Sequence, residues 1–274
     1  MTALGAETAG GEESTDADDV ASAAAWRFVL ATDLDGTFLG GSEPDRLALY
    51  RWIETHRAKV GLIFVTGRDP RFIEGLCADT PVPWPDFVVG DVGTTIARME
   101  PAGPGGRVAP IAALEAQIAA IWSDAGPRVR AALDGHPGLS LQPTAFRYRV
   151  SYDYDPVTYD ARAEAVVAEL GLDHLISADC YFDVLPKGVS KGPSITRLAE
   201  HLALDPGRVL VAGDTMNDYS MFETRFHGVA VGGSEEPLLA RVAAKDHVHK
   251  AEGIGAAGIM EAIAAFGLFD PAPS

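Results

Sequence analysis

The chain has 274 residues, of which 39 are Asp or Glu and 22 are Lys or Arg, so its formal net charge is −17. Hydrophobic residues make up 47 % and charged residues 22 %, a globular composition that suits one large domain or a core with a smaller second domain. The acidity argues against nucleic-acid binding, which depends on Lys and Arg, and no segment approaches the ~20 consecutive apolar residues of a membrane span.

The first 25 residues differ from the rest of the chain. They contain six acidic residues and no Lys, Arg or aromatic residue. Such a segment buries too little apolar surface to offset its ordering entropy, so we expect residues 1–25 to form a disordered acidic tail. No signal-peptide pattern is visible, and the two cysteines, Cys77 and Cys180, do not make a disulfide framework. We therefore expect a reducing, cytoplasmic location.

From residue 26 onward, short apolar runs alternate with helical patterns. The runs predict strands at 26–32, 60–65 and 86–89, and the patterns between them predict helices at 44–58 and about 70–78. Continuous apolar runs of this length are typical of strands buried on both faces of a parallel sheet. The alternation predicts an α/β fold with a doubly wound, mostly parallel sheet.

The pattern changes after residue 100, where the segment 101–106 (PAGPGG) predicts a loop. Residues 146–154 (FRYRVSYDY) alternate large and polar side chains as an antiparallel strand does. The other elements predicted here are helices at 110–122, near 124–134 and at 158–170, and strands near 174–177 and 179–185. We interpret residues 101–185 as an inserted α+β cap domain, with hinges near 101–106 and 184–188.

After the insert the parallel pattern resumes. The predicted elements are a helix at 191–203, a strand at 208–212, a helix at 215–224, a strand at 228–231, and helices at 235–243 and about 255–266. Residues 26–100 and 186–274 are therefore expected to form one catalytic core. Ligands of such sheets bind beyond the carboxyl ends of the strands, so we expect the active site there, under the cap.

The first motif is DLDGT (33–37), directly after the first predicted strand. Asp33 and Asp35 stand two residues apart on an extended segment, so their carboxylates point the same way and repel each other unless a cation or a ligand holds them. Gly36 permits a tight turn. The alternative is an Asx turn that only ends a strand.

Two further motifs indicate anion binding. Thr66-Gly67-Arg68 follows the second predicted strand, where a hydroxyl and backbone N–H groups form an anion cradle, or where Thr66 simply caps a helix. Lys191 begins a predicted helix within GVSKG (188–192). A cation is mildly unfavourable at a helix N-terminus, which hints at an anionic partner, and an exposed lysine at small cost is the alternative.

The fourth motif is GDTMND (213–218), after the predicted strand 208–212. Asp214 at the strand end and Asp218 one helical turn on can converge on one hard cation, and oxygen ligands of this kind suit Mg²⁺. A helix whose first turn is enriched in acids is the alternative. Separate strands that all end in such groups favour one shared site.

Taken in order, DLDGT, TGR, GVSKG and GDTMND resemble the four motifs of the haloacid dehalogenase superfamily phosphatases. Within that superfamily the chain resembles the sucrose-phosphate phosphatases, in the segments GDVGTTI (90–96), FRYRVSYDYDP (146–156), FDVLPKGVSKG (182–192), GDTMNDYSMFE (213–223) and GIMEAIAAFGLF (258–269). The resemblance covers residues 28–269 and implies a Rossmann-like core of haloacid dehalogenase type with an α/β cap. The chain departs from the family pattern at Thr94 and Thr95, which stand where the family has an acid, and at Arg149, which stands where it has Lys.

The resemblance implies a mechanism for the core motifs. Asp33 would be the nucleophile that attacks phosphorus to form an aspartyl-phosphate. Asp35 would protonate the departing sugar oxygen and then activate water. Thr66 and the backbone amide of Gly67 would bind the phosphoryl oxygens, and Lys191 would neutralise the phosphate and restrain Asp33.

The resemblance also implies Mg²⁺ as the cofactor. Its ligands would be Asp33, the backbone carbonyl of Asp35 and Asp214, with Asp218 either binding it directly or supporting the ligands beside Asn217. The substrate is a dianion and the nucleophile is an anion, so Mg²⁺ and Lys191 are expected to offset their repulsion.

Sugar specificity is expected from the cap and the core edge below it. The candidate substrate-binding residues are Thr66, Gly67, Arg68, Asp91, Gly93, Thr94, Arg147, Arg149, Ser151, Tyr152, Asp183, Lys187, Lys191 and Asn217. The leading hypothesis is a Mg²⁺-dependent phosphatase of sucrose 6-phosphate. The alternatives are a phosphatase of a glucosylglycerate, mannosylglycerate or amino-hexose phosphate, a sugar phosphomutase, and an idle domain that docks on a sugar-phosphate synthase. No motif residue is lost, which ranks the idle domain last.

Overall fold

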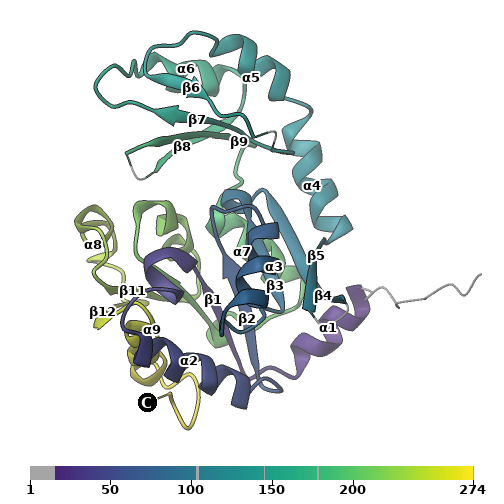
Figure 1. The fold of residues 1–274 in the computed structure, drawn as a ribbon, viewed down its shortest axis with the longest axis vertical. Helices are drawn as coiled ribbons and strands as arrows, with labels where there is room; N and C mark the ends of the chain where they lie inside the picture. The colour runs from purple at the N-terminus through teal and green to yellow at the C-terminus, as the bar shows by residue number, and fades with distance from the viewer. Residues whose placement is uncertain (1–15, 103–104, 145, 178, 274) are drawn as a thin grey trace, which may run out of the picture.

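The computed structural model describes residues 16–102, 105–144, 146–177 and 179–273. Figure 1 shows a lower core built on a large sheet and an upper cap built on a smaller one. The core sheet has eight strands, in the spatial order β12 (Val248–Ile254), β11 (His227–Gly232), β10 (Val209–Gly213), β1 (Phe28–Thr32), β2 (Val60–Val65), β3 (Phe87–Gly90), β4 (Thr95–Ala102) and β5 (Gly105–Pro110).

The core sheet is parallel from β12 through β3, and β4 and β5 are added to its edge in antiparallel pairing. Every residue of β1, β2, β3 and β10 is buried, as their continuous apolar sequences require. One face packs against α2 (Glu43–Thr55), α3 (Arg71–Asp79) and α9 (Ala256–Ala265), and the other packs against α1 (Asp16–Ala24), α7 (Lys191–His201) and α8 (Glu236–Val242). The predicted doubly wound α/β fold is confirmed.

The cap sheet is antiparallel, in the order β6 (Leu139–Leu141), β7 (Val150–Tyr154), β9 (Tyr181–Leu185) and β8 (Asp173–Ser177). Its apolar face packs around Phe182 together with α5 (Gly126–Ala132) and α6 (Arg162–Glu169). Alternate residues of β7 and β9 therefore point away from this apolar cluster. The helix α4 (Ala112–Trp122) joins the two parts, because Leu114 and Ile118 pack in the core and Trp122 packs in the cap (Figure 1).

Three predictions about local structure were wrong. Residues 16–24 form α1 rather than a disordered tail, because Ala23 packs into the core and Arg98 forms ion pairs with Asp16 and Asp19; residues 1–15 of the expected tail lie outside the described residues. The segment 101–106 is not a loop throughout, since Pro101 pairs with Gly106 in the β4–β5 hairpin, which places β5 in the core sheet. Four strands that the structure contains, β4, β5, β6 and β12, were also not predicted from the sequence.

The core also contains short turns of 3₁₀ or wider geometry. They are η1 (Leu34–Phe38) after β1, η2 (Asp91–Gly93) after β3, η3 (Pro206–Arg208) before β10 and η4 (Met216–Glu223) after β10. The segment predicted as a helix at 215–224 is thus a 3₁₀ helix. No helix in the described part of the chain is long and apolar enough to cross a membrane.

Candidate active site

The motif residues gather where three neighbouring strands of the core sheet end. Asp33 follows β1, Thr66 follows β2 and Asp214 follows β10, and β1 lies between the other two strands. Lys191, the first residue of α7, reaches the same place from the side. The expectation that these segments form one site at the carboxyl ends of the strands agrees with this placement.

Lys191 is fully buried and holds three oxygen atoms together. Its Nζ lies 2.6 Å from Asp33 Oδ1, 2.6 Å from Asp218 Oδ1 and 2.7 Å from Asn217 Oδ1. Burial alone would lower the pKa of Lys191, but the carboxylates of Asp218 and Asp33 outweigh burial and raise it. The lysine is therefore charged, and its position at a helix N-terminus is explained by the two carboxylates that face it.

Asp33 is the carboxylate most affected by its surroundings. Burial raises its pKa, Lys191 opposes that shift, and the negative charges of Asp218 and Asp214 add to it. The pKa of Asp214 is raised to about 6, first by burial and then by Asp218, while a hydrogen bond from Thr37 opposes the shift. These acids therefore need more positive charge than Lys191 supplies in order to stay ionised together.

Oxygen atoms of Asp33, Asp214 and Asp218 lie within 4.8 Å of one another, which is close enough to surround one cation. Asp218 is already fully hydrogen-bonded: Oδ2 accepts the backbone N–H groups of Asp214 and Thr215, each at 3.0 Å, and Oδ1 accepts Lys191. The carboxylates of Asp33 and Asp214 are thus better placed to give oxygen atoms to a metal, with Asp218 holding the loop beneath them. The donor set fits a hard divalent cation such as Mg²⁺.

Gly36 is needed for this arrangement. Its φ is +81°, in the left-handed region that favours glycine, and a Cβ atom there would collide with Oδ2 of Asp214. The glycine of the first motif thus lets the acid of the fourth motif approach the turn.

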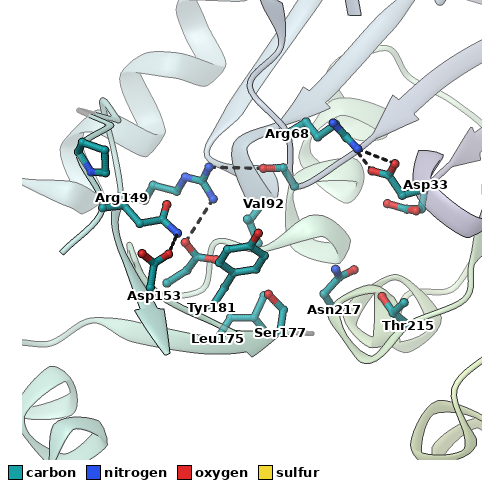
Figure 2. Close-up of a pocket in the computed structure, with 15 residues that line it drawn as sticks. Asp33, Arg68, Val92, Arg149, Asp153, Leu175, Ser177, Tyr181, Thr215 and Asn217 are labelled. Carbon is teal, nitrogen blue, oxygen red and sulfur yellow. Dashed lines mark hydrogen bonds and ion pairs between the residues drawn. The ribbon is translucent and has the colours of Figure 1, made fainter. Parts of the chain in front are cut away.

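Asp35 lines the same cavity as Asp33 and forms an ion pair with Arg68. Nε of Arg68 lies 2.7 Å from Oδ2 and Nη2 lies 2.8 Å from Oδ1, the contacts drawn as dashed lines from Arg68 in Figure 2. Both side chains are about half exposed. The Arg68 guanidinium also lies 4.2 Å above the ring of Phe72. Thr66 is buried, and its Oγ1 accepts the backbone N–H of Arg68 at 3.1 Å. Arg68 of the second motif therefore positions Asp35 of the first motif.

A cavity of about 680 Å³ opens above these residues, between the core and the cap. Its core side is lined by Asp33, Asp35, Gly67, Arg68, Val92, Thr215 and Asn217, and its cap side by Gln142, Pro143, Arg149, Asp153, Leu175, Ser177, Tyr181 and Asp183 (Figure 2). The size suits a small organic ligand. A ligand in this cavity would contact the motif acids on one side and the cap sheet on the other.

Arg149 connects the cap to the core across this cavity. Its Nη1 lies 3.3 Å from Oδ1 of Asp183, and its Nη2 lies 3.4 Å from the Gly67 carbonyl oxygen and 3.6 Å from Oδ1 of Asp91. Its guanidinium also lies 3.6 Å above the ring of Phe146. Ser151 Oγ donates to Asp183. Arg149 therefore links Asp183 of the cap to the core loop that carries Gly67.

A second core loop that Arg149 contacts, the one that begins at Asp91, has a strained backbone. Asp91 and Val92 have φ values of +51° and +58°, and the left-handed region is unfavourable for a β-branched residue. Thr94 Oγ1 donates to the Asp91 carbonyl, and Ser194 Oγ donates to the Gly93 carbonyl. Such strain persists where neighbouring contacts hold it, and it is often found at ligand sites.

Some candidate substrate-binding residues lie elsewhere. Arg147 forms an ion pair with Glu115 and lines a separate cavity of about 310 Å³. Lys187 lies 2.5 Å from Asp173 and lines another cavity, of about 490 Å³. Tyr152 belongs to the apolar cluster of the cap. The structure does not bring these three side chains to the cavity above Asp33.

The cap residues Gln142, Asp153, Ser177 and Tyr181 line the cavity but were not among the candidates. Alternation along a strand was a usable signal for two of them. Asp153 lies two residues from Ser151 on β7, and Tyr181 lies two residues from Asp183 on β9. No pattern in the sequence singles out Gln142 or Ser177.

Comparisons with known proteins show which family the chain resembles. The family model of the sucrose-6F-phosphate phosphohydrolases matches residues 26–267. The chain is 41 % identical over 241 residues to a glucosylglycerol-phosphate synthase of Pseudomonas anguilliseptica, covering 88 % of this chain and 31 % of that protein. It is 30 % identical over 275 residues to sucrose-phosphatase 1 of Nicotiana tabacum, covering 92 % of this chain and 61 % of that protein. The chain thus spans less than two thirds of the length of these two relatives.

A solved structure is also similar, that of the sucrose-phosphatase from Synechocystis sp. PCC6803 in complex with sucrose and phosphate. The TM-score is 0.77 at 25 % sequence identity, and the match covers 88 % of this chain and 98 % of that chain. The similarity therefore includes both the core and the cap.

Proposed function

The chain belongs to the sucrose-6F-phosphate phosphohydrolase family of haloacid dehalogenase-like phosphatases, and we propose that it hydrolyses sucrose 6-phosphate to sucrose and phosphate with Mg²⁺ as cofactor. The observation that carries the proposal is the position of Asp33. This buried carboxylate lies at the floor of the cavity between core and cap, 2.6 Å from the ammonium of Lys191. A nucleophile held by a buried cation beneath a sugar-sized cavity is what phosphoryl transfer to a carboxylate requires.

The reaction we propose has two steps. In the first, the Asp33 carboxylate attacks phosphorus, the bond from phosphorus to the sugar oxygen breaks, and Asp35 gives that oxygen a proton. In the second, Asp35 takes a proton from water, which attacks the aspartyl-phosphate and releases phosphate. Lys191 contacts Asp33, Gly67 lines the same cavity, and Thr66 follows the neighbouring strand; in our proposal these groups bind the phosphoryl oxygens.

The residues present fit a divalent cation, since the buried acids at the strand ends repel one another and their pKa values are raised. Asp33, Asp214 and the backbone carbonyl of Asp35 would hold Mg²⁺, with Asp218 and Asn217 supporting them through Lys191. When bound, Mg²⁺ offsets the negative charge of the phosphate and of Asp33.

A second candidate substrate is a glucosylglycerol phosphate. The specific observation is the 41 % identity, over 88 % of this chain, to a protein named for glucosylglycerol phosphate. Both substrates are phosphate monoesters of a glycoside, so the same core chemistry applies to both. A cytoplasmic location and association with a sugar-phosphate synthase are further proposals from the same resemblance.

The test is phosphate release from a panel of sucrose 6-phosphate, glucosylglycerol 3-phosphate and glucose 6-phosphate, with MgCl₂ or with EDTA. We expect release from the glycoside phosphates with MgCl₂ and none with EDTA. Asp33→Asn should lower kcat at least about 10³-fold while the variant stays folded by circular dichroism. Interconversion of hexose phosphates without release would favour a mutase, and near-full activity of Asp33→Asn would refute the assigned nucleophile.

A further inference from the structure

The cap side of the cavity is polar, and the only Lys or Arg among the described residues that line it, Arg149, is already paired with carboxylates. Gln142, Asp153 and Ser177 contribute an amide, a carboxylate and a hydroxyl, and Pro143 and Leu175 contribute apolar surface. Side chains of these types bind hydroxyl groups and the C–H faces between them. The wall therefore suits a ligand with many hydroxyl groups.

The two guanidinium groups that line the cavity are both bound to carboxylates. Arg68 donates two hydrogen bonds to Asp35, and Arg149 forms ion pairs with Asp183 and Asp91. A second anionic group on the substrate would compete with these carboxylates for positive charge that they already neutralise. Breaking the buried Arg149–Asp183 pair would leave a carboxylate in a buried place without its partner.

Asp153 adds a negative charge to the same wall. Its Oδ1 accepts a hydrogen bond from Nε2 of Gln142 at 2.9 Å, and no Lys or Arg among the described residues lies within ion-pair distance of it. An amide does not neutralise the carboxylate it binds. The Gln142–Asp153 pair can therefore donate to and accept from sugar hydroxyls, whereas it repels a carboxylate.

Tyr181 provides an aromatic surface beside this pair. Its side chain is 45 % exposed although it is large and begins a strand, and it lines the cavity. Figure 2 shows Tyr181 between Asp153 and Asn217, on the way from the cap wall to the core. A ring in this position can pack against the C–H face of a sugar whose hydroxyls reach Gln142 and Asp153.

We infer that the cap selects leaving groups that are uncharged and rich in hydroxyls, and that Asp153 is the residue that excludes glycosides carrying a carboxylate. The inference rests on the proposed function, since it concerns the leaving group of that reaction. It separates substrates that the core chemistry cannot tell apart. Sucrose and glucosylglycerol phosphates would be accepted, and glucosylglycerate phosphates would be rejected.

The test compares two substrates that differ at one carbon, glucosylglycerol 3-phosphate and glucosyl-3-phosphoglycerate. In the second, a carboxylate replaces a hydroxymethyl group. We expect kcat/KM of the wild-type enzyme to be at least about fivefold lower for the carboxylate substrate, mainly through KM, because two like charges near a protein surface repel by an amount of this order. Raising the ionic strength should narrow the difference, since Asp153 is exposed and its charge is screened.

Asp153→Asn keeps the size of the side chain and its hydrogen bond to Gln142 but removes the charge. We expect it to narrow the ratio of the two kcat/KM values at least about threefold. Glu169→Gln is the matched control, because it removes the same charge from an exposed position on α6 that does not line the cavity. It should leave the ratio unchanged.

Equal kcat/KM values for the two substrates in the wild-type enzyme would overturn the inference. So would a ratio that Asp153→Asn leaves unchanged, or that Glu169→Gln changes as much. If no substrate of the wider panel releases phosphate, the proposed function itself fails, and that outcome is distinct from a loss of selectivity.

Discussion

Arg68 binds Asp35 through two parallel hydrogen bonds, from Nε to Oδ2 at 2.7 Å and from Nη2 to Oδ1 at 2.8 Å. Both side chains are about half exposed, and exposed ion pairs contribute only about 0–1 kcal/mol to stability. The pair is therefore better understood as an orienting contact. It fixes the carboxylate that we propose as the acid and base of the reaction.

We predict that Arg68→Ala lowers kcat for sucrose 6-phosphate by about 10- to 100-fold, because the acid no longer has a fixed position beside the leaving oxygen. The kcat for p-nitrophenyl phosphate should fall much less, since nitrophenolate departs without needing a proton from Asp35. Steady-state kinetics on the two substrates measure the difference. Arg71→Ala, which removes an exposed arginine from the nearby start of α3, is the control. An equal loss on both substrates would show that Arg68 acts on the phosphoryl group instead.

The acidic cluster predicts a stability response to metal that needs no assay of activity. With Mg²⁺ at about a hundred times its dissociation constant, the melting temperature of the wild type should rise by roughly 5 °C. Asp214→Asn should abolish this rise, because it removes an oxygen charge from the cluster of Asp33, Asp214 and Asp218. Without metal the variant should be at least as stable as the wild type, since burial raises the pKa of Asp214 and its ionised form is unfavourable. An unchanged Mg²⁺ response would exclude Asp214 as a ligand.

Gly36 predicts a further effect on the metal site. Gly36→Ala places a Cβ atom against Oδ2 of Asp214 and strains a residue whose φ is +81°. Gly135→Ala is the matched control, because Gly135 also has a positive φ of +62° but has nothing within 4 Å of the added atom. Both should lose roughly 1 kcal/mol of stability from backbone strain. Only Gly36→Ala should also weaken Mg²⁺ binding, about tenfold or more by thermal shift; equal Mg²⁺ affinity in the two variants would contradict the role given to Gly36.

The core could be predicted from the sequence because its signals are local. A buried strand such as 60–65 is recognised as a continuous apolar run. The residue that follows such a strand lies at its carboxyl end, and this inference needs no knowledge of contacts elsewhere in the chain. This reasoning placed Asp33, Thr66 and Asp214 at one end of the sheet, and the structure adds that their strands are neighbours.

The cap could not be predicted to the same depth, because its contacts join residues far apart in the chain. Arg147 and Arg149 look equivalent in the sequence, and both precede β7, so strand alternation does not separate them. Their partners do: Arg147 pairs with Glu115, and Arg149 pairs with Asp183. Gln142 faces the cavity only because β6 pairs with β7, and β6 has three residues and no clear pattern. The glycines and prolines of 101–106 predict a loop, yet they are tolerated in the β4–β5 hairpin at the edge of the sheet.

The buried ion pair between Arg149 and Asp183, both in the cap, predicts a pH-dependent loss of stability. Arg149 and Asp183 are both buried, and burial raises the pKa of Asp183 while Arg149 lowers it. Arg149→Ala removes the opposing charge, so the pKa of Asp183 in the folded state rises further above that in the unfolded state. The unfolded chain then releases this proton at lower pH than the folded chain. The unfolding free energy of the variant should therefore fall, relative to wild type, as pH rises from about 5 to 8.

At pH 8 the decrease in unfolding free energy of Arg149→Ala should approach the roughly 3–5 kcal/mol expected when one partner of a buried ion pair is removed. Urea unfolding followed by circular dichroism at several pH values measures it. Arg149→Ala combined with Asp183→Asn should lose the part of the pH dependence that comes from Asp183 and recover part of the stability, because Asp183 no longer carries an unpaired buried charge. Asp91, which also faces Arg149, keeps its charge in this variant. Arg147→Ala, which removes a half-exposed arginine from the same segment, should show neither effect. A stability difference for Arg149→Ala that stays constant with pH would mean that Asp183 does not ionise alone, and the ion pair would then hold the cap by packing rather than by charge.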